Sequence, residues 1–291
     1  MEPPPIEPHK PLPQMLFPGD TNFTFRPQWH EQYAFAIDEG RRSRQDLAPP
    51  PEHWQNLRGH PDSEGFKDAA KIELEGIKSK DTYDLVPYPA GKQVLPVRWV
   101  FTHKLGTAGR LLRFKARLCV RGDLQDITGS DVYAATGVYR SLRILLALVA
   151  AFNLECHSAD VTNAFLNAVL DEEVYIKCPP GYEVRGHVWK LKRALYGLRT
   201  APRAWFKELT SFLSTIGFTP CPEDPCIVLH DSGIIIFFYV DDFLFIGPRS
   251  QAQEIATLKK VLNEKYGIKD LGPTSSFLNI KITRNREARM L

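Results

Sequence analysis

Two adjacent carboxylates, Asp241 and Asp242, lie between two strongly apolar runs of the sequence, residues 234–238 and 243–246. Both runs are rich in the β-branched and aromatic residues typical of buried strands. A short turn between such runs predicts a hairpin that holds both carboxylates near a core. Like charges placed there repel one another and lose hydration, and a divalent cation such as Mg²⁺ would compensate for both costs. A solvated hairpin turn is the alternative interpretation.

A third carboxylate, Asp160, follows a segment that predicts a strand over residues 154–161 and precedes a tight turn into an apolar patch at residues 162–166. If that strand lies beside the hairpin, three carboxylates meet at one edge of a sheet. Two metal ions held by such a set can clamp the attacking and leaving oxygens of a phosphoryl transfer, which needs no side-chain nucleophile. A turn or helix cap is the alternative for Asp160 alone.

Several segments, taken in order, resemble the polymerase motifs of Ty1/copia-type retrotransposon reverse transcriptases. The segments that resemble these motifs are Asp160–Leu166, Ala194–Arg199, Ala201–Trp205 and Tyr239–Asp242. Further segments resemble the lead-in (82–86 and 89–92), the fingers (99–101 and 114–118) and the closing strands (269–272 and 277–280) of that family. Asn279 stands where the family commonly has glycine. The resemblance covers about residues 61 to 285.

The resemblance implies roles for individual residues. Asp160, Asp241 and Asp242 would be catalytic, and together with the backbone at Val161 they would hold two Mg²⁺ ions, with Mn²⁺ as a possible substitute. Phe165 would abut the sugar of the incoming nucleotide and select dNTPs, because an aromatic ring there leaves no room for a 2′-hydroxyl.

The predicted nucleotide-binding set contains Phe165 and four other residues. Tyr196 and Gly197 would lie beneath the nascent base pair, where glycine permits close backbone approach. Lys115 and Arg117 would hold the triphosphate, because arginine is suited to bidentate phosphate contacts. An ordinary core aromatic is the alternative for Phe165.

The charge distribution is more informative than the net charge of +3. Residues 98–122 contain seven Lys or Arg and residues 184–204 contain six, and neither stretch contains an acidic residue. Basic segments beside a metal centre suit a phosphate backbone, although solvated faces are the alternative. The predicted nucleic-acid-binding residues are Arg98, Lys104, Arg113, Arg121, Lys190, Lys192, Arg193, Arg199 and Arg203.

The apolar periodicity predicts the elements that must position these residues. Helices are expected after Asp62, from Ser141, from Pro202 to a stop at Gly217, and from Ser250 to a stop at Gly267. A hairpin is expected over 97–105 and 111–120, and short strands over 174–177, 188–191 and 277–282.

The fold class expected is α+β, with reverse-transcriptase fingers and a palm built as a split βαβ antiparallel sheet with helices on one face. Residues 1–58 predict a Pro-rich disordered linker. Residues 59–285 predict the fingers and palm, and 286–291 a truncated C-terminal end. Thumb and RNase H domains are expected to be absent.

The function expected is that of an RNA-directed DNA polymerase fragment, which transfers dNMP from dNTP to a primer 3′-hydroxyl on an RNA template. One alternative is a catalytically inactive relic that still binds nucleic acid. Another is a different metal-dependent phosphotransferase. A covalent continuation into integrase and RNase H, in a longer polyprotein, is also expected from the resemblance.

The five cysteines are scattered, which is typical of free thiols in a reducing compartment. The N-terminus has no apolar signal region, and no run approaches 18 apolar residues. The expected location is therefore intracellular, either cytoplasmic and particle-associated or nuclear, without secretion or membrane insertion.

Overall fold

The computed structural model describes residues 42–106, 108–126, 134–135, 137 and 139–291. Most of the predicted Pro-rich linker, residues 1–41, lies outside this range. The described remainder of that segment is folded, with short 3-10 helices η1 (Arg44–Asp46) and η2 (Trp54–Leu57). Leu57 is 2% exposed, and Trp54 packs against Trp99 with ring centroids 5.8 Å apart. Trp54 and Leu57 therefore pack against the core, although they lie within the segment predicted as a linker.

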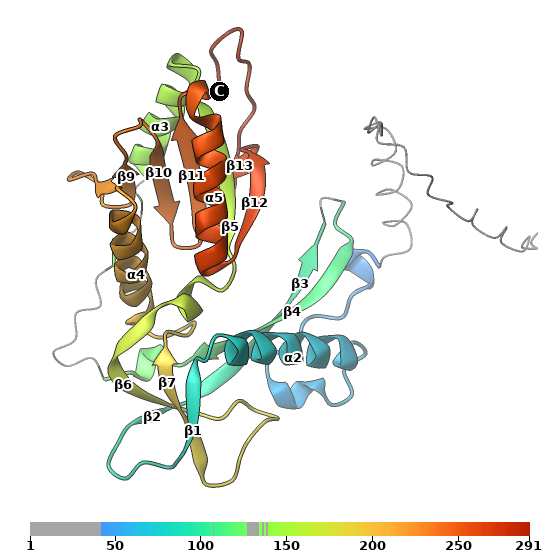
Figure 1. The fold of residues 1–291 in the computed structure, drawn as a ribbon. Helices are drawn as coiled ribbons and strands as arrows, with labels where there is room; N and C mark the ends of the chain where they lie inside the picture. The colour runs from blue at the N-terminus through green and yellow to red at the C-terminus, as the bar shows by residue number, and fades with distance from the viewer. Residues whose placement is uncertain (1–41, 107, 127–133, 136, 138) are drawn as a thin grey trace, which may run out of the picture.

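The larger part of the fold is a six-stranded antiparallel sheet in the order β12-β5-β11-β10-β9-β8 (Figure 1). Its strands are β5 (Glu155–Val161), β8 (Thr219–Pro220), β9 (Ile227–Leu229), β10 (Ile235–Tyr239), β11 (Asp242–Gly247) and β12 (Ile268–Pro273). The predicted hairpin is β10 and β11, joined by the two residues Val240 and Asp241. Strand β5 lies beside this hairpin, paired with β11, so the condition for bringing the three carboxylates to one edge is met.

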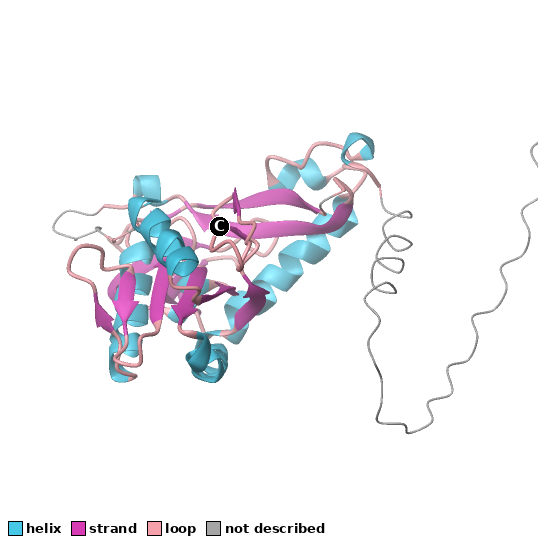
Figure 2. Ribbon diagram, turned by 90° about the horizontal axis from the view of Figure 1, so that it is seen from above, coloured by secondary structure: helices cyan, strands magenta, loops and turns pink. Residues whose placement is uncertain are grey.

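Three helices accompany this sheet: α3 (Tyr139–Ala151), α4 (Ala201–Thr215) and α5 (Ala252–Tyr266). Helices α4 and α5 cover one face, whereas α3 lies on the opposite face (Figures 1 and 2). The prediction of helices on one face is therefore correct for α4 and α5 and wrong for α3. Because β10 and β11 are covered on both faces, their sequences are apolar without interruption rather than alternating.

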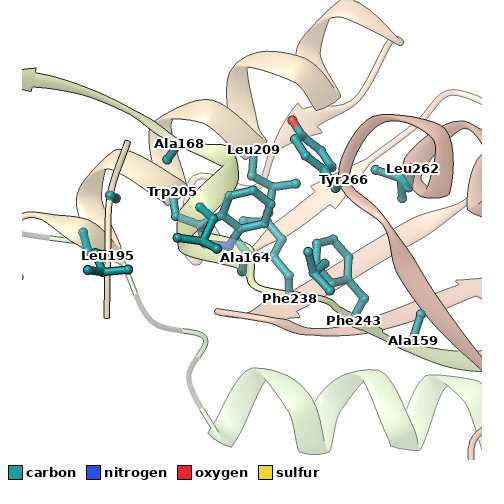
Figure 3. Packing of buried hydrophobic residues seen from close by; sticks show 14 of the residues in the cluster. Ala159, Ala164, Ala168, Leu195, Trp205, Leu209, Phe238, Phe243, Leu262 and Tyr266 are labelled. Carbon is teal, nitrogen blue, oxygen red and sulfur yellow. The ribbon is translucent and has the colours of Figure 1, made fainter. Parts of the chain in front are cut away.

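The core between the sheet and the two helices is built from large aromatic side chains (Figure 3). Trp205 of α4 meets Tyr266 of α5 edge to face, with centroids 5.1 Å apart. Phe206 of α4 packs 6.0 Å from Phe238 of β10. Helix α5 ends at Gly267, whose φ of +78° is the left-handed conformation that favours glycine at a helix C-terminus.

The smaller part of the fold surrounds the helix α2 (Ser63–Ser79). A long hairpin, β3 (Val97–Leu105) and β4 (Leu111–Val120), packs against α2. A four-stranded sheet has the order β1-β7-β6-β2 and consists of β1 (Tyr83–Pro87), β2 (Val94–Leu95), β6 (Val169–Lys177) and β7 (His187–Arg193). The 3-10 helices η3 (Gly122–Leu124), η4 (Ala164–Asn167) and η5 (Arg249–Gln251) lie in connections.

The α+β class is confirmed, and so are α2 and the β3–β4 hairpin. The predicted strand 277–282 is instead a very small hairpin of β13 (Ser276–Phe277) and β14 (Ile280–Lys281). Leu278 and Asn279 form its turn at φ of +46° and +63°. Asn279 thus occupies a conformation that asparagine tolerates better than most residues.

The last residues, 286–291, are tied to the rest of the fold. Arg286 forms an ion pair of 2.7 Å with Glu155 of β5. No helix in the described ranges is both long and apolar enough to cross a bilayer.

Candidate active site

The three carboxylates predicted from the sequence lie together at one end of the six-stranded sheet. Asp160 and Asp242 are directly opposite one another on the neighbouring strands β5 and β11. Residues paired in this way project from the same face of a sheet, with Cβ atoms about 5 Å apart. Asp241 lies in the adjoining turn, and its carbonyl accepts a hydrogen bond of 2.8 Å from the Val161 amide. The turn is thereby fixed to the end of β5.

The turn itself is held in an unusual backbone conformation. Val240 has a φ of +58°, which is an outlier for a β-branched residue and costs free energy. The Trp205 indole donates a hydrogen bond of 2.8 Å to the Val240 carbonyl, so α4 supports the turn from below. Backbone strain of this kind is concentrated at functional sites, where the surrounding structure imposes it.

The carboxylates repel one another in the apo protein. Burial raises the pKa of Asp160, and the charge of Asp241 raises it further, whereas Lys115 and Lys269 act in the opposite direction. Burial, with the charges of Asp241 and Asp160, raises the pKa of Asp242 to about 6. The site thus holds concentrated negative charge that its own lysines only partly balance.

The donor set fits a hard divalent cation that also binds phosphate. Within the described ranges, no three His, Cys, Asp or Glu side chains converge closely enough to hold a metal ion by themselves. Mg²⁺, however, is usually held by one or two carboxylates together with substrate phosphates and water. Asp160 and Asp242 on one face, with Asp241 beside them, match that incomplete coordination.

Phe165 and Tyr196, both predicted to bind nucleotide, lie side by side, and Tyr196 is within electrostatic reach of Asp241 and Asp160. Phe165 comes from η4, and its ring meets that of Tyr196 edge to face at 4.9 Å. Arg117 of β4 lies over the Tyr196 ring at 5.6 Å. Burial and the charge of Asp241 raise the pKa of Tyr196 to about 12, so the phenol stays neutral. Residues far apart in sequence thus form one wall of the site.

The structure shows why position 197 requires glycine, which the sequence did not reveal. A Cβ atom at this position would lie 2.2 Å from the Val120 carbonyl oxygen, and the backbone has a φ of +92°. Immediately beside it, a Cβ atom on Gly122 would lie 2.0 Å from the Gly197 carbonyl oxygen. The close backbone approach at Gly197 is therefore to the chain's own strand β4.

The β3–β4 hairpin has one strongly basic face. Strand pairing sets Arg98 opposite Cys119, Val100 opposite Arg117, Thr102 opposite Lys115, and Lys104 opposite Arg113. All five cations therefore project from the same side of the hairpin, which we call the basic face: Arg98, Lys104, Arg113, Lys115 and Arg117.

The basic face is directed toward the carboxylates. Lys115 and Lys104 both lower the pKa of Asp160, which places them within electrostatic reach of it. Burial lowers the pKa of Lys115, and the charges of Arg117 and Arg113 lower it further. Concentrated, partly buried positive charge opposite concentrated negative charge is the arrangement expected around a bound nucleoside triphosphate and its metal ions.

The second predicted basic stretch is different, because its cations have acidic partners. Lys190 forms an ion pair of 2.7 Å with Glu173. Lys192 pairs with Asp81 at 2.6 Å and with Asp84 at 2.9 Å. These carboxylates come from β6 and from the chain around β1. The local charge around residues 184–204 is therefore less positive than the lack of acidic residues in that stretch indicated.

The other predicted nucleic-acid-binding residues fall into two groups, those bonded within the protein and those exposed on its surface. Arg193 donates a hydrogen bond of 3.0 Å to the Asn167 carbonyl, and Arg121 forms an ion pair of 2.7 Å with Asp123. Arg199 and Arg203 are exposed, Arg203 near Asp171. The basic face of the β3–β4 hairpin therefore carries most of the electrostatic case for nucleic-acid binding.

Two residues of the site could not have been identified from sequence. Lys269 of β12 is paired opposite Asp160, on the strand's other side from Asp242. Glu73 of α2 accepts a hydrogen bond of 3.3 Å from the Leu118 amide, near Lys115 and Arg117. Both positions depend on long-range packing. The only signal in the sequence was that Lys269 begins the segment 269–272, which resembles a closing strand of the family.

Comparisons with known proteins identify the family of this chain. Residues 80–291 match the family described as reverse transcriptase (RNA-dependent DNA polymerase). The retrovirus-related Pol polyprotein from transposon TNT 1-94 of Nicotiana tabacum is 36% identical over 250 residues, which cover 83% of this chain and 19% of that protein.

Two further relatives show the same pattern. The retrovirus-related Pol polyprotein from transposon RE1 of Arabidopsis thaliana is 32% identical over 76% of this chain and 16% of its own length. The transposon Ty1-DR5 Gag-Pol polyprotein of Saccharomyces cerevisiae is 28% identical over 70% of this chain and 12% of its own. The chain thus spans less than a fifth of the length of these relatives.

Proposed function

This chain belongs to the reverse transcriptase family of Ty1/copia-type retrotransposons, and on that basis we propose that it is the polymerase region of an RNA-directed DNA polymerase. The six-stranded sheet with α4 and α5 corresponds to the palm. Helix α2, the β3–β4 hairpin and the four-stranded sheet correspond to the fingers. The observation that carries the proposal is the placement of Asp160 opposite Asp242, with the basic face directed toward them.

In the proposed reaction a primer 3′-hydroxyl attacks the α-phosphate of a dNTP and releases pyrophosphate. Two Mg²⁺ ions, which Mn²⁺ could replace, would supply Lewis acidity and charge neutralisation at the attacking and leaving oxygens. Asp160, Asp241 and the Val161 backbone would hold them, with Asp242 assisting. Lys115 and Arg117 would orient the triphosphate by charge and by bidentate contact.

The remaining residues of the site would select the substrate. The edge-to-face packing of Phe165 on Tyr196 supports a rigid ring beside the sugar of the incoming nucleotide. Template choice would come from base pairing, so the protein needs contacts with backbone and duplex shape rather than with base edges. The partners are accordingly an RNA template, a DNA primer and dNTPs.

Two alternatives differ from this proposal. Family membership favours a polymerase over an unrelated metal-dependent phosphotransferase. A relic that binds nucleic acid without extending a primer shares the family and the basic face, and it is separated only by an activity measurement.

Primer extension on an RNA template tests the proposal, with Asp241→Asn as the inactive control. The parent chain should extend the primer in Mg²⁺ or Mn²⁺. The variant should lose incorporation by at least about a hundredfold while its unfolding midpoint is kept, because a neutral amide removes metal-binding charge and relieves repulsion. A parent that binds the hybrid without extending it would support the relic. Undiminished extension by Asp241→Asn would contradict the assigned role of that carboxylate.

A further inference from the structure

Asn167 closes the 3-10 helix η4, the turn that carries Phe165, and it is the centre of a buried hydrogen-bond network. Its side chain is shielded, with the residue 8% exposed. Its amide oxygen accepts a hydrogen bond of 2.8 Å from the Lys80 ammonium. Its amide nitrogen donates back to the carbonyls of Asn163 (3.4 Å) and Ala164 (3.3 Å) within the same turn. The side chain therefore ties the two ends of η4 together.

Lys80 reaches this network from a distant part of the chain. It is the residue that follows α2, and its ammonium also donates to the Tyr266 carbonyl at 3.5 Å. That carbonyl belongs to the last turn of α5, where a cation is favoured by the helix dipole. One ammonium thus connects α2, η4 and α5. We call Lys80, Asn167, Arg193 and the Tyr266 carbonyl the Asn167 junction.

A second cation holds the backbone of the same turn. Arg193, at the end of β7, donates a hydrogen bond of 3.0 Å to the Asn167 carbonyl. Lys80 and Arg193 belong to different elements, since one follows α2 and the other ends β7. Short 3-10 helices have poor internal hydrogen-bond geometry, so their position depends strongly on anchors of this kind.

The position of η4 determines where the Phe165 ring lies. Phe165 is two residues before Asn167, and its carbonyl accepts a hydrogen bond of 3.0 Å from the Ala168 amide. Its ring contacts Tyr196 across a centroid distance of 4.9 Å. A small rotation of the turn would therefore move the ring relative to Asp160, which precedes the turn on β5.

We propose that Lys80 is a positioning residue for substrate selection, which acts through Asn167 to fix the Phe165 ring and so sets the discrimination between deoxyribonucleotides and ribonucleotides. The inference rests on the proposed polymerase function, because it assigns a determinant of specificity to that reaction. Lys80 itself does not touch the substrate. Its removal leaves the carboxylates and the basic face in place while it releases the turn that carries the ring.

The first test is kinetic and uses Lys80→Met, which keeps the length of the side chain and removes its charge and hydrogen bonds. The ratio of kcat/KM for a dNTP to that for the matching rNTP should fall by about fivefold or more. Lys80→Arg should retain most of the discrimination. Lys78→Met removes an exposed lysine from the same helix end and should leave the ratio unchanged. An unaltered ratio in folded, active Lys80→Met would overturn the proposal.

The second test needs no catalysis. A 4-fluorophenylalanine placed at position 165 reports the environment of the ring by ¹⁹F NMR. Lys80→Met should shift or broaden the resonance, and Lys78→Met should not. If the parent extends no primer, the proposed function fails, and the ¹⁹F spectrum decides the positioning role by itself. An identical spectrum in both variants would overturn that role. Should Lys80→Met not fold, Lys80→Gln is judged by the same two measurements.

Discussion

At the scale of single residues, the arrangement of the carboxylates reduces the stability of the folded protein. Asp160 and Asp242 are paired across two strands, and burial together with the charge of Asp241 raises the pKa of each. Directly opposed like charges destabilise a sheet. The protein retains this arrangement at the same place where Val240 adopts its strained conformation. Both costs are explained if the site's task is to bind cations and phosphate.

The raised pKa of Asp242, about 6, predicts how stability changes with pH. A carboxyl whose folded pKa lies above its unfolded value of 3.8 binds its proton more tightly when folded. Its contribution to stability is therefore fully present below pH 3.8 and is lost as the pH rises through 6. The metal-free protein should become less stable between about pH 4 and pH 7 on this account.

The variant Asp242→Asn should remove the part of the pH dependence of stability that comes from this carboxyl. We expect its melting temperature to exceed that of the parent at pH 8 by a few degrees, roughly the effect of 1 kcal/mol in a domain of this size. At pH 4 the two should be nearly equal. Thermal unfolding in EDTA at both pH values measures this, and an equal difference at both values would contradict the repulsion argument.

Phe165 gives a second prediction at this scale. Phe165→Val should admit ribonucleotides, because the smaller side chain opens space beside the sugar while Tyr196 keeps its place. The ratio of rNTP to dNTP incorporation should rise by more than about tenfold, equivalent to about 1.4 kcal/mol in transition-state free energy. Single-nucleotide extension with each substrate measures the ratio. No change would make Phe165 an ordinary core aromatic.

At the scale of elements, the connection between the two parts of the fold depends on a close crossing of backbones. The loop through Gly197 lies against the end of β4, and the Val120 amide donates a hydrogen bond of 2.8 Å to the Tyr196 carbonyl. Gly122, at the start of η3, meets the same loop. This crossing fixes the Tyr196 side chain relative to the basic face, so the packing of two glycines positions one wall of the site.

Gly197→Ala should accordingly be strongly destabilising. The substitution combines a positive φ with a Cβ atom that would lie 2.2 Å from a backbone oxygen. Gly186→Ala is the matched control, because Gly186 also has a positive φ, +75°, but no atom lies within 4 Å of the added Cβ. The control should cost about 1 kcal/mol. Gly197→Ala should cost at least about twice as much in urea unfolding, and equal costs would count against the crossing.

At the scale of the whole molecule, charge is distributed unevenly between two surfaces. The basic face opposes the carboxylates, and within the described ranges none of its five cations forms an ion pair with a carboxylate. On the four-stranded sheet, by contrast, Lys190 and Lys192 are paired with carboxylates. Long-range attraction for a polyanion should therefore come from the hairpin, although both segments are equally basic in the sequence.

Salt dependence of binding to an RNA–DNA hybrid distinguishes the two surfaces. Replacement of Arg98, Lys104 and Arg113 with Gln should flatten the log–log slope by roughly 2 to 3 units, since each duplex phosphate contact contributes about 0.9. The control replaces three lysines that form ion pairs with carboxylates, namely Lys92, Lys190 and Lys192, with Gln, and so removes the same number of charges. That control should leave the slope nearly unchanged. Equal effects in both triple variants would contradict the assignment of the basic face.

The sequence by itself determined the features that depend on neighbouring residues. The apolar runs on both sides of Asp241 and Asp242 required a hairpin, and Pro202 and Gly267 marked helix ends because their backbone preferences act locally. The order of motifs was sufficient to identify the family. The basic face could also be predicted from the sequence, because residues two apart on a strand lie on the same side of it.

Only the tertiary structure decided which distant residues meet. The register that sets Asp160 opposite Asp242, the acids that pair with Lys192, and the Asn167 junction all join segments far apart in the chain. Such contacts depend on how whole elements pack, and no local pattern encodes the partner of a given side chain. The sequence therefore specified the chemical groups of the site, and the packing of its elements determined their positions and the charge around them.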